Sequence, residues 1–207
     1  MPLSFEDQIT VEKTPGYFVD KNVPELIYKM NPKIKLILII RDPTYRAISE
    51  YTQVIENDGN KIDSSSYSNF SIKFEKNVLH SNGSVNEMYP YIYKGIYVLH
   101  LKKWLEYFPL EQILILDGKK LILDPFSILQ KVEKYLNLQP FIRPDHFVFD
   151  KNKGFMCIKE NSKILCLGET KGRKHIFVSN DVKNKIKEFY EPYNKQLFEL
   201  IKQEPFF

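Results

Sequence analysis

The sequence has no hydrophobic run long enough to cross a bilayer, and its first residues, MPLSFEDQIT, lack the apolar core of a signal peptide. It also lacks the GxxxxGK[ST] motif of a loop that holds a nucleoside triphosphate. Glycine is scarce: only eight occur in 207 residues and none precedes Gly16, so no glycine-rich loop lies in the first fifteen residues. These absences disfavour a membrane-spanning protein and a nucleotide kinase.

Charge is nearly balanced, with a formal net charge of +4, 27% charged residues and 43% hydrophobic residues. This composition is typical of a globular protein, and the length suits a single domain over residues 1–207. A mild positive charge fits an anionic ligand, but it does not indicate a nucleic acid, and we expect no nucleic-acid partner.

Cysteine is rare as well, because Cys157 and Cys166 are the only two. Eight residues separate them, with Asn161 midway, which favours a hairpin tip closed by a disulfide worth roughly 2–3 kcal/mol. Two reduced thiols in a cytosolic protein are the alternative. Neither a CxxC pair nor a nearby histidine pair is present, so we expect no metal site.

Two triplets fit the N-glycosylation pattern, one beginning at Asn69 and one at Asn82. Such triplets also occur by chance. Together with the expected disulfide, they favour a secretory compartment and a glycoprotein.

Apolar periodicity predicts strands alternating with helices. We expect an α/β fold with a mostly parallel central sheet flanked by helices, and a polar loop at 57–66. The predicted strands are 9–12, 35–40 and 113–116, and the predicted helices are 24–30, one from Pro43, 91–108, 127–136 and 181–202, the last broken or kinked at Pro192.

The run LILII at 36–40 reads as a parallel strand covered on both faces, and it leads directly into Arg41. Ligands of open α/β sheets bind beyond the carboxyl ends of such strands, so Arg41 is a candidate anion ligand. The helix from Pro43 would offer free backbone N–H groups to the same anion. Ser49 and Gln53 share a face of that helix. The alternative is that Arg41 pairs with Asp42 or another acid and that Ser49 is merely solvated.

Two further segments carry candidate ligands. The stretch Lys171-Gly172-Arg173-Lys174-His175 surrounds one glycine with cations, although such a cluster is more often a solvated loop. Lys13, in the sequence EKTP, follows the predicted first strand and would face the ligand crevice. A surface lysine before a turn is an equally good interpretation.

Six segments in this order carry a resemblance: EKTPGYF (12–18), VPELIYKMNP (23–32), LILIIRDPTYRAISEYTQ (36–53), WLEYFPLEQILILDG (104–118), KGFMC (153–157) and CLGETKGRKH (166–175). Over essentially its whole length the chain resembles the sulfotransferase domain of heparan sulfate glucosaminyl 3-O-sulfotransferases. The resemblance implies a P-loop-kinase-like fold that lacks its first strand and phosphate loop. It also implies transfer of a sulfuryl group from 3′-phosphoadenosine 5′-phosphosulfate to the 3-hydroxyl of glucosamine in heparan sulfate, without a metal.

The resemblance assigns roles to individual residues. Charge stabilisation at the reacting centre falls to Lys13, and the disulfide to Cys157 and Cys166. The positions matching the donor site are Arg41, Ser49, Met156, Lys171, Gly172, Arg173, Lys174 and His175. Those matching the acceptor site are Lys13, Thr14, Pro15, Gly16 and Gln53.

The family's glycine-rich loop and its catalytic glutamate lie upstream of the KTP segment, and we expect both to be absent from residues 1–207. We therefore expect this chain to represent part of a longer enzyme, incomplete at its N-terminus. The resemblance implies the Golgi lumen, with a membrane anchor only in a longer product. A different reading is a binding module for heparan sulfate and donor that has lost the transfer machinery. A nucleotide kinase is a third reading, against which the missing triphosphate loop argues.

Overall fold

The computed structural model describes residues 8–57, 64–161, 163–168 and 174–207. A parallel pair of strands, β1 (Leu36–Ile40) and β2 (Ile113–Asp117), forms its centre. Leu36 lies opposite Ile113 and Ile40 opposite Asp117, so both strands end at the same edge of the sheet. The predicted α/β class with a parallel central sheet is confirmed.

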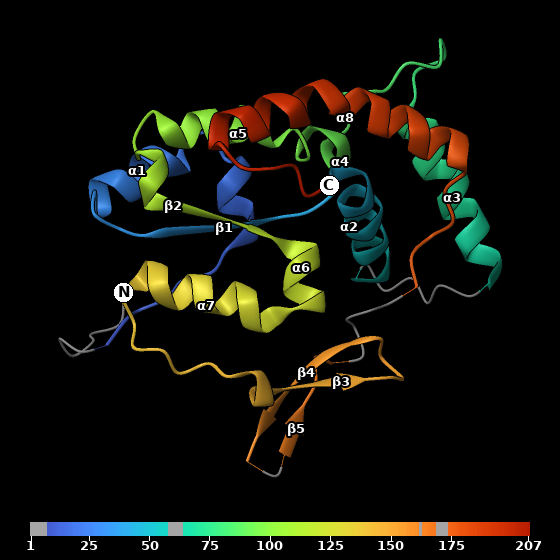
Figure 1. Cartoon of the computed structure of the whole chain (residues 1–207). Coiled ribbons are helices and arrows are strands. Elements are labelled where there is room, and N and C mark those ends of the chain that lie inside the picture. Colours follow the sequence, from blue (N-terminus) through green and yellow to red (C-terminus); the bar gives the residue numbers. More distant parts are fainter. Residues whose placement is uncertain (1–7, 58–63, 162, 169–173) are drawn as a thin grey trace.

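Helices lie on both sides of this pair (Figure 1). Helix α7 (Pro125–Leu136) runs along one face, whereas α5 (Tyr97–Leu105) and α8 (Asn180–Ile201) cover the other. Beside the carboxyl ends of the strands lie α2 (Pro43–Asn57) and α6 (Gly118–Leu123). The remaining helices are α1 (Val23–Met30), α3 (Ser64–Val78), α4 (Pro90–Tyr93) and the short 3-10 helices η1 (Pro15–Val19), η2 (Leu110–Gln112) and η3 (Pro144–His146).

A second, antiparallel sheet lies below the first in Figure 1. It contains β3 (Phe147–Asp150), β4 (Phe155–Glu160) and β5 (Lys163–Leu165), in that order. The β4–β5 hairpin is the one closed by the Cys157–Cys166 disulfide, so the predicted disulfide is confirmed and the reduced alternative is excluded.

The two faces of β1 are covered unequally. Leu36, Leu38 and Ile40 pack into the main core, which α2, α5 and α8 share. Ile37 and Ile39 point to the other face, where their side chains remain 41% and 51% exposed. The expectation that this strand is covered on both faces is therefore wrong. Within the described residues, β2 is the only strand that pairs with β1, and α7 contacts β2.

Close packing at the carboxyl edge depends on one glycine. A Cβ added to Gly118 would lie 3.1 Å from the carbonyl oxygen of Ile40. Asp117 caps the helix that follows, because its side chain accepts a 2.7 Å hydrogen bond from the Lys119 N–H. The chain thus turns sharply away at the edge where Arg41 leaves β1.

Three further expectations are wrong. Residues 9–12 form no strand. Of the polar loop predicted at 57–66, residues 64–66 belong to α3, and residues 58–63 lie outside the described residues. The predicted helix at 91–108 is two helices, α4 and α5, separated around Gly95. A Cβ at Gly95 would lie 2.4 Å from the Tyr190 hydroxyl oxygen, so α8 packs where a continuous helix would need a side chain.

The remaining helices follow the expectations closely. Residues 24–30 and 127–136 lie inside α1 and α7, and a helix does begin at Pro43. Helix α8 continues through Pro192, so the predicted break is not present. In the described part of the chain, no helix combines the length and the apolar character that crossing a membrane requires.

Candidate functional site

Arg41 lies immediately beyond the carboxyl end of β1, and its position is fixed through its backbone. The hydroxyl of Tyr97, on α5, donates a 2.9 Å hydrogen bond to the Arg41 carbonyl oxygen. The side chain is half-buried, and burial is the main cause that lowers the pKa of Arg41. Its guanidinium makes no hydrogen bond or ion pair with any residue that the structure describes. A partly desolvated cation of this kind favours an anionic ligand.

The neighbouring carboxylate does not neutralise Arg41. Asp42 caps α2 instead, because its Oδ1 accepts hydrogen bonds from the backbone N–H groups of Thr44 at 2.8 Å and Tyr45 at 3.3 Å. The alternative in which Asp42 pairs with Arg41 is thus not observed. The same cap corrects another expectation: these two N–H groups of α2 are already occupied and are not free to bind an anion.

A second arginine on α2 has a different role. Arg46 forms an ion pair with Glu50 and donates to the carbonyl oxygen of Tyr91, while Glu50 also pairs with Lys94. These contacts tie α2 to the segment around α4. The Arg46 guanidinium therefore has a structural role, whereas the Arg41 guanidinium has no described partner.

Ser49 and Gln53 lie one turn apart on α2, as predicted, with Ser49 half-buried and Gln53 exposed. Thr52, between them in sequence, is fully buried. Its Oγ1 donates to the Ile48 carbonyl oxygen at 2.8 Å and accepts a 3.3 Å hydrogen bond from the Ile176 N–H. This contact holds the chain directly after Lys174 and His175 against α2, and both of those side chains are exposed. Lys171, Gly172 and Arg173 lie outside the described residues.

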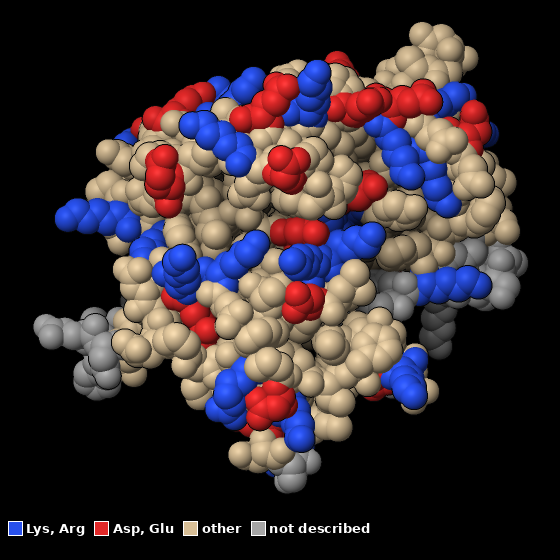
Figure 2. Space-filling model, in the orientation of Figure 1, with Lys and Arg blue, Asp and Glu red and all other residues tan. Residues whose placement is uncertain are grey.

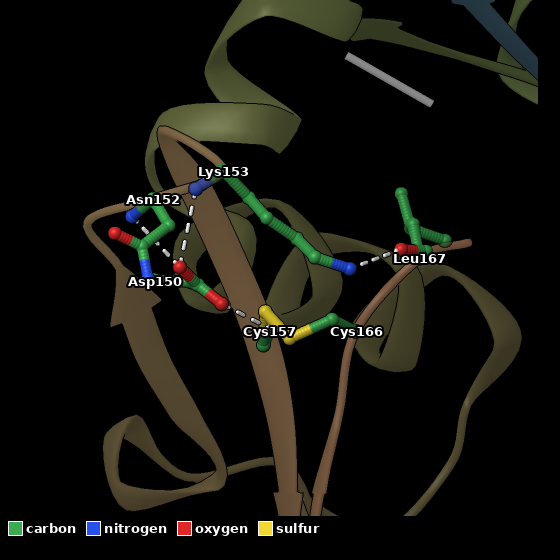
Figure 3. Close-up of a disulfide and its surroundings, with 6 residues drawn as sticks. All are labelled: Asp150, Asn152, Lys153, Cys157, Cys166 and Leu167. Carbon is green, nitrogen blue, oxygen red and sulfur yellow. Dashed lines mark hydrogen bonds between the residues drawn. A yellow bond between two sulfur atoms is a disulfide. The ribbon is translucent and has the colours of Figure 1, made fainter. Parts of the chain in front are cut away.

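The other end of that basic segment is attached to the small sheet (Figure 3). Cys166 is joined to Cys157 of β4, and the ammonium of Lys153 donates a 3.0 Å hydrogen bond to the Leu167 carbonyl oxygen. Asp150 organises this turn, because its Oδ1 accepts from the backbone N–H groups of Asn152 and Lys153 at 2.9 and 3.1 Å. Leu167 on one side and Ile176 on the other are therefore each anchored, and residues 169–173 between them lie outside the described residues.

Met156, the residue before Cys157 on β4, is half-buried and lies opposite Phe149 in the β3–β4 register. Because successive side chains of a strand point to opposite faces, Met156 faces away from the buried Cys157. The hydrogen bonds and ion pairs of the described residues do not join it to Arg41 or Ser49.

Lys13, Thr14, Pro15 and Gly16 are exposed; the first two precede η1, and Pro15 and Gly16 begin it. The Thr14 hydroxyl donates to a Glu12 carboxylate oxygen at 2.6 Å, but no described hydrogen bond or ion pair joins Lys13 to Arg41 or to α2. η1 is anchored through Phe18.

Phe18 links this segment to α5. Its carbonyl oxygen accepts a 3.1 Å hydrogen bond from the Trp104 indole N–H. The Phe18 ring packs near Tyr97, with centroids 6.3 Å apart, and near His100 at 5.6 Å. Tyr97 therefore contacts both the η1 segment and the Arg41 backbone, and it is the residue through which the structure connects two of the predicted site segments.

Lys and Arg side chains form a band across the middle of the face in Figure 2, below α8 and above the small sheet.

A pocket of about 780 Å³ opens between α8, the start of α2 and the end of the chain. Asp42, Glu188, Glu191 and Glu199 outnumber Lys187 and Lys195 in its lining, so its charge does not suit a phosphate group.

One group of potential metal ligands occurs among the described residues: Asp150, Cys157 and Cys166, whose ligand atoms lie within 4.8 Å of one another. The disulfide occupies both thiols, so these residues do not offer the thiolates that a metal would need.

The sequence matches a known protein family. A family model described as the sulfotransferase domain matches residues 17–204. The chain belongs to the sulfotransferase family. The sequence is also 44% identical over 202 residues to mouse (Mus musculus) heparan sulfate glucosamine 3-O-sulfotransferase 5, covering 97% of this chain and 57% of that relative. It is 38% identical over 203 residues to human (Homo sapiens) heparan sulfate glucosamine 3-O-sulfotransferase 3B1, covering 97% of this chain and 50% of the relative.

The resemblance predicted from the sequence motifs is thereby confirmed. This sulfotransferase domain spans about half the length of the curated relatives it matches. A crystal structure of a sulfotransferase from Alicyclobacillus acidocaldarius superposes with a TM-score of 0.59 at 15% sequence identity, covering 91% of this chain and 63% of the other. That similarity shows the fold.

Sequence reasoning missed the residues that position the site rather than line it. The sequence patterns gave no role to Thr52, which lies between Ser49 and Gln53 on α2, or to Tyr97, which lies within the helix predicted at 91–108. Lys153 did lie in the quoted KGFMC segment, but its bond to Leu167 joins residues fourteen positions apart and has no periodic signal. A signal was available for Tyr97 alone, because a tyrosine on a buried helix face needs a partner for its hydroxyl.

Proposed function

We propose that this sulfotransferase domain acts in the transfer of a sulfuryl group from 3′-phosphoadenosine 5′-phosphosulfate to the 3-hydroxyl of a glucosamine in heparan sulfate. Support comes from the relatives, whose names specify heparan sulfate glucosamine and 3-O-sulfotransfer. We propose further that residues 1–207 belong to one domain and that the protein works in the Golgi lumen. The disulfide supports an oxidising compartment.

One observation carries the proposal: the guanidinium of Arg41 is partly desolvated at the carboxyl edge of the parallel strands and has no described partner. Arginine is suited to bidentate binding of a phosphate. We therefore assign Arg41 and Ser49 to the 3′-phosphate of the donor. The remaining residues assigned to the donor are Met156, Lys171, Gly172, Arg173, Lys174 and His175.

The anchored segment supports this assignment. The Thr52–Ile176 hydrogen bond holds the residues that follow His175 against the helix that bears Ser49. Cations on this segment can then neutralise the charge that develops on the leaving phosphate. We assign the acceptor side to Gln53, exposed on the same helix, and to Lys13, Thr14, Pro15 and Gly16.

The reaction is an in-line displacement. The glucosamine 3-hydroxyl oxygen forms a bond to sulfur, the bond between sulfur and the donor phosphate oxygen breaks, and adenosine 3′,5′-bisphosphate leaves. The hydroxyl proton passes to a carboxylate base, which the family resemblance places upstream of the KTP segment and outside residues 1–207. Lys13 would stabilise negative charge at the reacting centre, and fixed cations do so without reorganisation during the step.

Transfer of labelled sulfate from the donor to heparan sulfate tests this function, using protein that includes any residues preceding Met1 in the natural product. Chondroitin sulfate, which lacks glucosamine, is the matched acceptor control. We expect label in heparan sulfate alone, and digestion of the product should release a glucosamine sulfated at its 3-hydroxyl. Label at another position would contradict the proposed acceptor group.

A second candidate is a non-catalytic module that binds heparan sulfate and the donor. The family resemblance favours it for residues 1–207 alone, because it places the glycine-rich loop and the catalytic glutamate upstream of the KTP segment. Binding of both ligands without sulfate transfer would support this candidate.

A further inference from the structure

The chain contains two N-glycosylation sequons, Asn69-Phe70-Ser71 and Asn82-Gly83-Ser84, and the fold places their side chains differently. N-glycosylation depends on the asparagine and on the hydroxyl residue two positions later. A glycosyltransferase that recognises the asparagine and the hydroxyl residue of one sequon must reach these two side chains from the same side. The two sites differ in this respect.

Asn69 lies inside helix α3. Residues two positions apart on an α-helix are separated by about 200° around its axis, so Asn69 and Ser71 point in nearly opposite directions. Asn69 is exposed, whereas Ser71 is only 8% exposed. The folded helix therefore presents the asparagine without its hydroxyl partner.

Asn82 lies in the turn that follows α3, and both it and Ser84 are exposed. Its Oδ1 accepts hydrogen bonds from the Ser84 backbone N–H at 3.0 Å and from the Ser84 hydroxyl at 2.7 Å. This is an Asx turn, and it brings the amide and the hydroxyl together on one side of the chain.

Contacts over a very short stretch close the turn. Leu79 and Val85 form an isolated antiparallel bridge, and the His80 N–H donates to the Ser84 carbonyl oxygen at 2.8 Å. Gly83 has φ +82°, which a glycine adopts without strain. Since every partner is nearby in sequence, the turn can form before the rest of the domain folds. The segment between α3 and α4 also projects from the body of the molecule (Figure 1).

We propose that Asn82 is an N-glycosylation site of this chain and that Asn69 is not. In the reaction, the side-chain nitrogen of Asn82 forms a bond to the anomeric carbon of a lipid-linked oligosaccharide. The bond from that carbon to the lipid pyrophosphate oxygen breaks, the lipid pyrophosphate leaves with the bonding electrons, and one amide proton passes to a base of the transferase. The attached glycan would extend from the projecting turn, away from the edge that carries Arg41.

The test is secretion of the 207-residue chain behind a cleavable signal from a eukaryotic cell, followed by intact-mass measurement before and after enzymatic removal of N-linked glycans. We expect one glycan on the unaltered chain and on Asn69→Gln, and none on Asn82→Gln or Ser84→Ala. Ser84→Thr, which keeps the hydroxyl, should retain the glycan. The mass is measured on chain recovered from the cells as well as from the medium, so a variant that folds poorly and is not secreted still gives a result.

Two glycans on the unaltered chain, a glycan that survives in Asn82→Gln, or an unaltered chain with no glycan would each overturn the proposal. The result is also independent of the proposed sulfotransfer, because the assay contains no sulfate donor or acceptor. Adenosine 3′,5′-bisphosphate should bind the glycosylated and deglycosylated chains equally.

Discussion

The Tyr97 hydroxyl donates a 2.9 Å hydrogen bond to the carbonyl oxygen of Arg41, and the same tyrosine packs near Phe18 of η1. Burial raises the pKa of Tyr97 to about 12, so this donor keeps its proton at physiological pH. A core residue of α5 thereby fixes the backbone of the arginine assigned to the donor phosphate. The position of Arg41 thus depends on helix packing as well as on the strand that precedes it.

Tyr97→Phe should separate that hydrogen bond from the packing of the ring. We expect the free energy of unfolding to fall by about 1–2 kcal/mol, because a buried carbonyl oxygen loses its donor. Binding of adenosine 3′,5′-bisphosphate should weaken as Arg41 becomes less restrained. Urea unfolding and calorimetric titration measure the two effects. Tyr28→Phe is the control, because Tyr28 is exposed and its hydroxyl makes no hydrogen bond with the described residues. Unchanged nucleotide binding in Tyr97→Phe would argue against this role.

Two buried threonines of α2 offer a matched comparison. Thr52 is 0% exposed and its Oγ1 joins Ile176 to the helix, whereas Thr44 is 1% exposed and its Oγ1 has no hydrogen-bond partner among the described residues. Replacing Thr52 by the isosteric valine leaves the Ile176 N–H unpaired, so we expect a loss of about 1–3 kcal/mol in unfolding free energy. Thr44→Val should be neutral or stabilising, because it removes an unpaired polar atom. Thermal and urea unfolding measure both. Equal losses in the two variants would contradict the anchoring role of Thr52.

Lys153→Met should weaken nucleotide binding without unfolding the domain. The side chain is exposed, and its ammonium holds the Leu167 carbonyl oxygen just before the basic segment. We expect binding of adenosine 3′,5′-bisphosphate to weaken about three- to tenfold, as loss of one charge-assisted hydrogen bond at an exposed site implies.

Lys151→Met is the control for Lys153, since it removes the same charge from the same turn without a described contact to Leu167. Lys153→Arg should restore part of the affinity. If both methionine variants bind equally weakly, net charge rather than anchoring is responsible, and the anchor hypothesis fails.

His100 makes stability depend on pH. Burial lowers its pKa below the usual 6.5, and its Nε2 lies 3.1 Å from the Tyr93 carbonyl oxygen. The unfolded chain therefore binds this proton more readily than the folded chain. The stability that neutral His100 contributes is present above about pH 6.5 and is lost as the pH falls further.

Urea unfolding at pH values of about 7.5 and 5.5 tests this dependence on the unaltered chain and on His100→Gln, whose amide does not titrate. The unaltered chain should lose more stability than the variant between these two conditions. An equal loss would exclude His100 as the cause. The exposed His80 provides the control substitution, His80→Gln, which should behave as the unaltered chain.

Local chemistry made much of the fold predictable. Apolar periodicity located α1, α2 and α7, and the apolar runs located β1 and β2. Features that depend on packing between segments far apart in sequence could not be predicted. The helix expected at 91–108 divides because Tyr190 of α8 occupies the space beside Gly95, a contact between residues far apart in sequence. The exposure of Ile37 and Ile39 could not be predicted either, because the sequence of a strand does not determine whether other elements cover one face or both.

The candidate site was predictable where a residue type alone indicates chemistry. An arginine after a buried strand pointed to an anion, and its guanidinium is indeed free of described partners. Asp42 shows the limit of such reasoning. A helix start predicts free N–H groups, but the preceding aspartate side chain accepts hydrogen bonds from two of them. The roles of Arg41, Ser49, Gln53, Met156 and Lys13 remain predictions.

The central claim is that Arg41 binds the 3′-phosphate of the donor. Calorimetric titration of the 207-residue chain and of Arg41→Ala with adenosine 3′,5′-bisphosphate and with 5′-AMP tests it most directly. We expect the unaltered chain to prefer the bisphosphate and the variant to lose about 10- to 100-fold in bisphosphate affinity with little change for 5′-AMP, as loss of a charged hydrogen-bond pair implies. Arg143→Ala, which removes an exposed arginine paired with Asp145, should leave both affinities unchanged. An Arg41→Ala chain that is folded and keeps the full preference for the bisphosphate would contradict the account.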